Sequence, residues 1–113
     1  TTLAKTINDG VFEPRALALT STGKLFIANG SNDVTVYPAG KTSPRRTIYN
    51  GVGNPIALLL DQQSRLFVDN ATQISPSGGK GTVTIYKSNG QLIETIYDGL
   101  HEPRAILLGS SQV

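Results

Sequence analysis

The 113-residue chain contains no cysteine, no methionine and no tryptophan. Without cysteine it forms no disulfide, has no thiolate chemistry and offers no Cys-based zinc site. The chain begins at Thr1 and has no methionine anywhere. We therefore expect either that an N-terminal segment was removed, as with a cleaved signal peptide, or that the chain is a piece of a longer one.

Charge and long apolar runs are also scarce. The formal net charge is +2, and the lysines and arginines are scattered along the chain. A nucleic-acid partner is not expected, because such proteins usually carry a basic stripe. The one basic pair, Arg45-Arg46, is interpreted as a solvated strand end. No apolar run approaches the roughly 18 residues that would cross a bilayer, so we expect no membrane span.

What the sequence does contain is a repeat. Three segments align without gaps: TINDGVFEPRALAL from Thr6, TIYNGVGNPIALLL from Thr47 and TIYDGLHEPRAILL from Thr95. The same phase continues downstream, where GKLFIAN (23–29) matches SRLFVDN (64–70) and VTVY (34–37) matches VTIY (83–86). The three aligned segments are offset by 41 and 48 residues, which is typical of propellers or solenoids.

Each repeat contains four short strand candidates separated by turn residues. In the first repeat they are 15–19, 24–28, 33–37 and 45–49, rich in β-branched and aromatic residues. In the second repeat the first strand, IALLL at 56–60, is apolar throughout, which suits burial on both faces. We predict an all-β protein of propeller blades, each with four antiparallel strands. A single domain over 1–113 would hold blade 1 at about 14–49 and blade 2 at about 55–97.

The strand and turn pattern carries a family resemblance. The segments PRALALTSTGKLFIAN…VTVY and PIALLLDQQSRLFVDN…VTIY resemble NHL-type propeller repeats and their gluconolactonase-like relatives. The resemblance covers most of the chain and implies the blade architecture. It implies little about activity, because this fold hosts many unrelated functions.

Two complete blades cannot close a propeller, which needs about four to eight. Partial blades are expected at both ends: LAKTI at 3–7, within 1–7, matches a fourth strand, and RAILL at 104–108, within 103–113, is a first strand without successors. Three hypotheses follow: a fragment of a longer propeller, a ring of several copies, or a filament of copies added head to tail. We favour a structural module that self-associates, because free sheet edges and uncovered faces invite pairing with further copies.

Polar residues gather at the loops that precede the first strand of each repeat. In a propeller of this type these loops and the loops between the second and third strands open on one side, where ligand sites usually lie. A common polar surface is therefore predicted from Glu13, Arg15, Asn54, His101, Glu102 and Arg104. The alternative is a surface ion pair at the start of each strand, worth only about 0–1 kcal/mol. If the chain is a fragment of a longer propeller, this surface would bind a protein or carbohydrate.

Signatures of catalysis are weak. Gluconolactonase-like relatives hold a divalent metal with Glu, Asn and Asp in motifs that this chain lacks, although Asn54 and Asp61 carry suitable side chains. Calcium prefers six to eight oxygen ligands, and no acidic cluster provides them. NHL-type lyases hold zinc with several histidines, and His101 is the only one here. No G-x-S-x-G motif is present. We therefore predict no metal, no cofactor and no enzyme, with a lactonase-like hydrolase fragment as the third alternative.

Two N-glycosylation sequons occupy the same repeat position, Asn29-Gly30-Ser31 and Asn70-Ala71-Thr72. With the missing Cys and Met and a surface rich in Ser and Thr, they suggest an extracellular or secreted protein that carries sugar on Asn29 and Asn70. The alternative is a turn role, because asparagine tolerates tight turns and bonds its own backbone.

Overall fold

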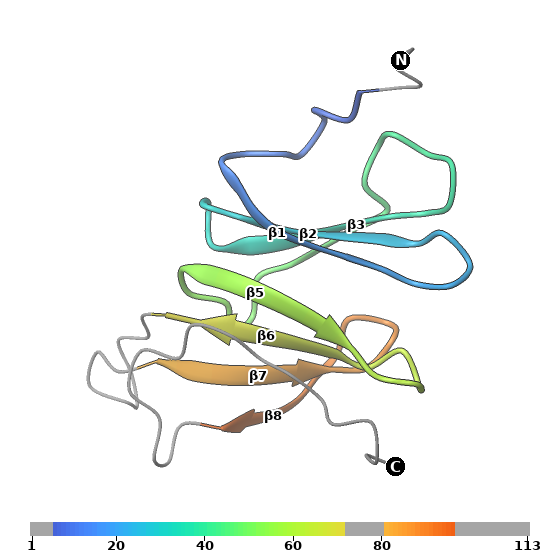
Figure 1. Cartoon of the computed structure of the whole chain (residues 1–113). Helices are drawn as coiled ribbons and strands as arrows, with labels where there is room; N and C mark the ends of the chain where they lie inside the picture. Colours follow the sequence, from blue (N-terminus) through green and yellow to red (C-terminus); the bar gives the residue numbers. More distant parts are fainter. Residues whose placement is uncertain (1–5, 72–80, 97–113) are drawn as a thin grey trace.

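The computed structural model describes residues 6–71 and 81–96, and within these ranges it contains eight strands and no helix (Figure 1). The strands are β1 (Pro14–Leu19), β2 (Leu25–Asn29), β3 (Asp33–Tyr37), β4 (Arg46–Ile48), β5 (Pro55–Leu60), β6 (Leu66–Asn70), β7 (Thr82–Tyr86) and β8 (Leu92–Ile96). They form two antiparallel four-stranded sheets, each with its strands in sequence order. The predicted all-β fold of four-stranded blades is confirmed, and we call the sheets the first and second blade.

The predicted strands match closely, because the turn residues fix where each one ends. The main difference is β4, which covers only Arg46–Ile48 where 45–49 was expected. Of the partial blades at 1–7 and 103–113, residues 1–5 and 103–113 lie outside the described residues. Thr6 and Ile7 are described and are not in a strand.

One face of each blade forms the contact between them. Side chains alternate between the two faces of a strand, and the pairing register brings matching residues of neighbouring strands onto one face. β1 and β5 lie side by side at this contact (Figure 1), which we call the blade joint. Its first-blade side is Ala16, Ala18, Phe26, Ala28, Val34, Val36 and Ile48, and its second-blade side is Leu58, Leu60, Leu66, Val68, Tyr86 and Leu92.

Each blade is preceded by a segment that folds over its sheet in the same way. The Tyr37 hydroxyl donates to the backbone oxygen of Asp9 at 2.8 Å, and the Tyr86 hydroxyl donates to that of Asn50 at 2.6 Å. Gly51 follows Asn50 with a φ of +83°, and a Cβ there would lie 3.3 Å from the Tyr86 hydroxyl. The repeated Asp/Asn-Gly pair is therefore required by backbone conformation and by the close approach of the tyrosine.

Candidate functional site

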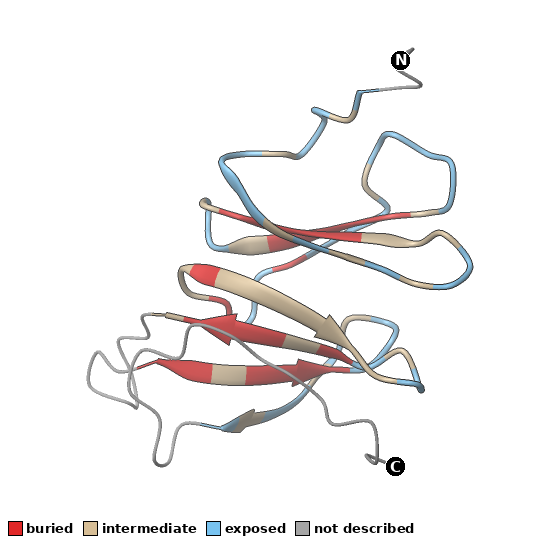
Figure 2. Cartoon of the chain, in the orientation of Figure 1, coloured by how far each residue is buried: buried red, intermediate tan, exposed pale blue. Residues whose placement is uncertain are grey.

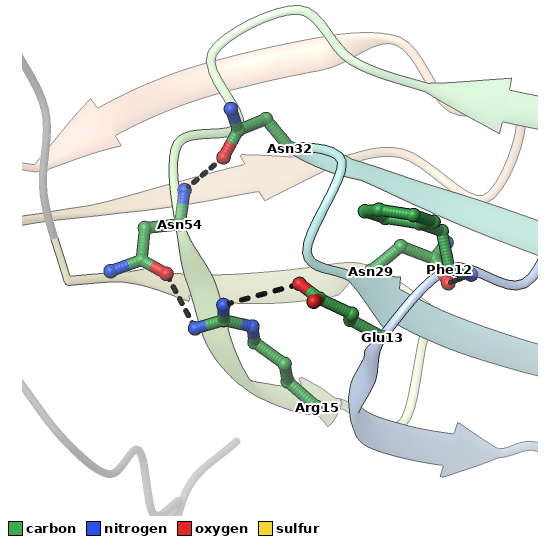
Figure 3. A network of polar contacts seen from close by, with 6 residues as sticks. All are labelled: Phe12, Glu13, Arg15, Asn29, Asn32 and Asn54. Atoms are coloured by element: carbon green, nitrogen blue, oxygen red, sulfur yellow. Dashed lines mark hydrogen bonds and ion pairs between the residues drawn. The ribbon is translucent and has the colours of Figure 1, made fainter.

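The predicted polar surface exists in part, as a cluster that links the two blades (Figure 3). Arg15, at the start of β1, donates through Nη1 to Oδ1 of Asn54 at 2.7 Å, across the blade boundary. The Glu13 carboxylate lies 3.9 Å from Nη2 of the same arginine. Asn32, in the turn between β2 and β3, accepts from the backbone N–H of Asn54 at 2.7 Å. Of the six predicted residues, the structure brings together Glu13, Arg15 and Asn54.

Backbone strain marks the same position in both blades. Glu13 has a φ of +47° and Asn54 a φ of +49°, and each precedes a proline. A left-handed conformation is unfavourable for most residues other than Gly and Asn, and costs about 1–3 kcal/mol. In this left-handed conformation Asn54 bonds both Asn32 and Arg15 of the first blade. The strained backbone of Asn54 is therefore part of the contact between the blades.

The cluster is exposed, and its ion pair is weak. The Glu13 and Arg15 side chains are 66% and 40% exposed, and exposed pairs of this kind contribute about 0–1 kcal/mol. The remaining predicted members, His101, Glu102 and Arg104, lie outside the described residues. The described residues of the cluster form hydrogen bonds between the first blade and the segment that begins the second blade.

Asn29 and Asn70 have a structural role that extends beyond the local turn role considered as the alternative to glycosylation. Both are fully buried. Asn29 accepts from the backbone N–H of Phe12 at 3.1 Å, and Asn70 accepts from that of Gly53 at 2.9 Å. Each side chain thus fastens the segment before its blade to the sheet.

The other end of each asparagine amide is also engaged. Nδ2 of Asn29 lies 3.2 Å from the Ile27 carbonyl oxygen and 3.1 Å from the Thr35 hydroxyl. Nδ2 of Asn70 bonds Val68 and Thr84 in the same way. N-linked sugar attaches to Nδ2, so burial and bonding of this atom argue against the predicted glycosylation at both positions.

A second set of polar contacts closes the opposite end of the blade joint. Lys24 donates from Nζ to the backbone oxygen of Ser88 at 3.1 Å, and Arg46 donates to the backbone oxygen of Asn89. Both oxygens belong to the turn between β7 and β8. Arg46 lies so close to Gly90 that a Cβ there would be 2.7 Å from its Cδ. The blade joint therefore has an apolar centre. At this end of it, two basic side chains of the first blade donate to backbone oxygens in a turn of the second blade.

The opposite face of the first blade presents an exposed apolar patch on β1. Leu17 and Leu19 are 64% and 66% exposed, and Phe12, just before the strand, is 56% exposed. Their repeat equivalents Leu58 and Leu60 are partly buried in the blade joint. Figure 2 shows β1 largely exposed or intermediate, whereas β2 and β3 behind it are mostly buried. We call this side the outer face of the first blade.

The outer face of the second blade corresponds by repeat position to the inner face of the first blade, and it contains a buried carboxyl group that the inner face of the first blade lacks. By the register it carries Ala57, Leu59, Phe67, Asp69, Val83 and Ile85. Asp69 is fully buried, and neither carboxylate oxygen has a hydrogen-bond partner. Burial raises the pKa of Asp69 to about 6. Its equivalent in the first blade is Ala28, which lies in the blade joint.

Within residues 6–71 and 81–96, no three His, Cys, Asp or Glu side chains gather in a way that could hold a metal ion. Asp61 instead bonds Arg65, at 2.5 Å from Oδ2 to Nε. Burial acts to raise the pKa of Asp61, but the hydrogen bonds that it accepts from Arg65 and Gln63 hold this pKa below its usual value.

The same described ranges contain no helix with the length and apolar character needed to cross a membrane. Comparisons with protein-family models and with curated proteins find no match to this chain. The NHL-type relationship therefore stays a prediction.

Proposed function

We propose that the chain is a non-enzymatic structural module whose blades stack onto further copies of itself. The observation that carries the proposal is the exposed apolar patch of Leu17 and Leu19, whose repeat equivalents are packed in the blade joint. Burying a leucine side chain fully contributes about 1.5–3 kcal/mol, which favours covering such a patch.

The repeat also supplies a suitable cover. The first blade packs its inner face, which contains Ala16 and Ala18, onto the second-blade face that contains Leu58 and Leu60. The second blade carries the equivalent of that inner face on its own outer side, with Ala57 and Leu59. The outer face of the first blade is the equivalent of the receiving surface, with Leu17 and Leu19. The two outer faces thus correspond by repeat position to the two halves of the joint within the chain, with Leu59 and Asp69 in place of Ala18 and Ala28 on the second-blade face.

Assembly through these faces is heterologous, because each copy uses a different surface toward each neighbour. Repetition of a blade joint with a constant rotation closes at about four to eight blades. With two blades per copy, a closed ring contains about two to four copies. A rotation that does not close gives a filament instead.

Sedimentation velocity of the intact chain, over a range of concentrations, tests this proposal. We expect particles several times heavier than the 12.0 kDa chain. Combined Leu17→Ser and Leu19→Ser should shift the particles toward monomer. Tyr49→Ser is the matched control, because Tyr49 is 72% exposed and lies after the outermost strand β4. A wild-type chain that stays monomeric and folded at all concentrations would contradict the proposal.

A second candidate function is ligand binding by a fragment of a longer propeller, and the polar cluster favours it. Arg15, Glu13 and Asn54 lie together on one edge with exposed charged groups, which suits a polar protein or carbohydrate ligand. A glycan and peptide binding screen tests this candidate, with Arg15→Ala expected to abolish any binding found. Binding that survives Arg15→Ala would place the ligand elsewhere.

A further inference from the structure

We infer that the joint between copies runs head to tail, with Glu94 of one copy set against Lys41 of the next. The inference rests on the proposed function, because it requires that copies stack. It adds the direction of stacking and the residue pair that gives the contact its specificity.

The argument starts from the charged end of the internal blade joint. Arg46, at the start of β4, lies over the turn between β7 and β8, against Gly90 and the Asn89 carbonyl oxygen. In that turn the N–H of Gly90 donates to the carbonyl oxygen of Lys87 at 2.8 Å. The arginine here donates to a backbone oxygen, and Gly90 leaves room for its side chain.

The repeat gives each of these positions an equivalent. Arg46 pairs with Val36, and Glu94 pairs with Ile85, the residue that matches Val36, so Glu94 is the second-blade equivalent of Arg46. In the turn between β3 and β4, the N–H of Lys41 donates to the carbonyl oxygen of Pro38 at 3.0 Å. Lys41 therefore closes its turn with the same backbone hydrogen bond as Gly90, although the left-handed residue of the first turn is Gly40, with a φ of +75°, whereas in the second turn it is Gly90 itself, with a φ of +91°.

Copying the internal joint between two molecules brings these equivalents together. The side chain at the Arg46 position becomes Glu94, and the residue beneath it changes from Gly90 to Lys41. An anion now faces a cation where the internal joint has a cation on a glycine turn. Both Glu94 and Lys41 are exposed in the single chain. The internal joint sets Arg46 against Gly90 and therefore has no such ion pair. The joint between copies differs from it in the charge of the two facing residues.

The contact that Lys24 makes in the internal joint also has an equivalent that is compatible with head-to-tail stacking. Lys24 donates to the Ser88 carbonyl oxygen in the internal joint. Its second-blade equivalent is Arg65, and the equivalent of Ser88 is Ala39. Docking of copies would place the Arg65 guanidinium near the Ala39 carbonyl oxygen, so a basic donor again meets a backbone acceptor.

Charge exchange between two variants tests the inference. Lys41→Glu alone and Glu94→Lys alone should each place like charges across every joint and raise the apparent dissociation constant about threefold to tenfold. An equimolar mixture of the two variants should assemble as the native chain does. When the two variants alternate, every joint again sets an acidic side chain against a basic one, because one variant is acidic at both positions and the other is basic at both. The double variant Lys41→Glu/Glu94→Lys should also assemble normally.

Lys87→Glu is the matched control for charge, because Lys87 is exposed and lies on the turn used by the internal joint. It changes net charge as Lys41→Glu does and should leave the dissociation constant within about twofold. Circular dichroism verifies that each variant is folded.

The possible failures are distinguishable. A native chain that stays monomeric overturns both the proposed function and this joint. A native chain that assembles, with charge variants that behave like the control and a mixture that restores nothing, overturns only the Glu94–Lys41 joint and leaves assembly standing. Weakened single variants restored by mixing support the head-to-tail joint.

Discussion

β1 and β5 are equivalent strands with nearly the same apolar pattern and the same pairing register to the next strand, including the irregularity after the proline. Their environments differ. Leu58 and Leu60 of β5 are partly buried in the blade joint, whereas Leu17 and Leu19 of β1 are about two thirds exposed. Local sequence therefore specifies the strand, its turn and its partner. Burial of its faces depends on whether another blade lies against it.

The third pair of equivalents sharpens the comparison. Ala28 packs in the blade joint, and Asp69 occupies the same position on the outer face of the second blade. A buried carboxyl group without a partner is costly, because it loses the hydration of its charged form. The two blades thus share an architecture, but burial of this position is favourable for Ala28 in the first blade and costly for Asp69 in the second.

The largest expected effect comes from Asp69→Ala, which gives the second blade the residue of the first. The pKa of Asp69 is raised from its usual 3.8 to about 6, so the folded protein holds the proton more tightly than the unfolded chain. The free energy of unfolding is therefore highest below about pH 4, where Asp69 is protonated in both states. It falls by about 3 kcal/mol as the pH rises through about 6. Urea unfolding from pH 4 to pH 7 should show this decline in the native chain and lack it in the variant. Parallel pH profiles would contradict the assignment.

The next effect concerns the buried asparagines. Asn29→Ala and Asn70→Ala each leave a buried backbone N–H without its acceptor, Phe12 in one blade and Gly53 in the other. We expect each to lower the free energy of unfolding by about 2 kcal/mol. Thermal or urea unfolding measures this, with Asn8→Ala, which changes an exposed asparagine, as the control. A large difference between the two buried sites would show that the blades are not equivalent in this respect.

Substitution of the two equivalent leucines, Leu58 and Leu17, should affect the stability of the monomer differently. Leu58→Ala removes contacts in the blade joint and should cost about 1–2 kcal/mol, less than a fully buried leucine. Leu17→Ala should change monomer stability by about 0.5 kcal/mol or less, while weakening association. Chemical denaturation at concentrations too low for assembly gives the first result, and sedimentation gives the second. Equal losses of monomer stability would mean that the exposed leucine is already covered within the chain.

The smallest effect concerns the strained residue before each proline. Glu13→Asn gives the first blade the residue that the second has at Asn54, which tolerates the left-handed conformation better. We expect a gain of about 0.5–1 kcal/mol, measured by urea unfolding. Asn54→Glu is the reverse change and should destabilise by at least as much. Opposite signs from these would show that the ion pair of Glu13 with Arg15 outweighs the strain.

Much of the fold could be predicted from the sequence because strand and turn patterns are local. The repeat of Thr6 and Thr47 located the blades, and Gly23 and its equivalent Ser64 located the first hairpins. The face of each strand that is covered could not be predicted, because the periodic pattern is the same in both blades. A turn role for Asn29 and Asn70 could be predicted, but their hydrogen bonds to the segment before each blade could not, because only the fold shows that both amides are buried there.

The candidate site was predicted in part. Glu13, Arg15 and Asn54 were expected near one another because their loops share an end of the blades, and they are. The loop of their partner Asn32 was expected on the same side, but Asn32 itself was not predicted as a member, because a single polar residue in a turn carries no signal in the sequence. The contacts of Lys24 and Arg46 were also missed, since both end on backbone oxygens, which any residue provides.

The central claim is that the outer face of the first blade is covered by the outer face of the second blade of another copy. The chain has no cysteine, so single cysteines can report this contact without interference. Leu17→Cys and Leu59→Cys chains should be mixed and treated with a short bismaleimide, with Leu17→Cys plus Tyr49→Cys as the control. We predict rapid formation of the mixed Leu17→Cys/Leu59→Cys dimer, well above the control and above either chain alone. Equal yields in all mixtures, or a dominant Leu17→Cys homodimer, would contradict the claim.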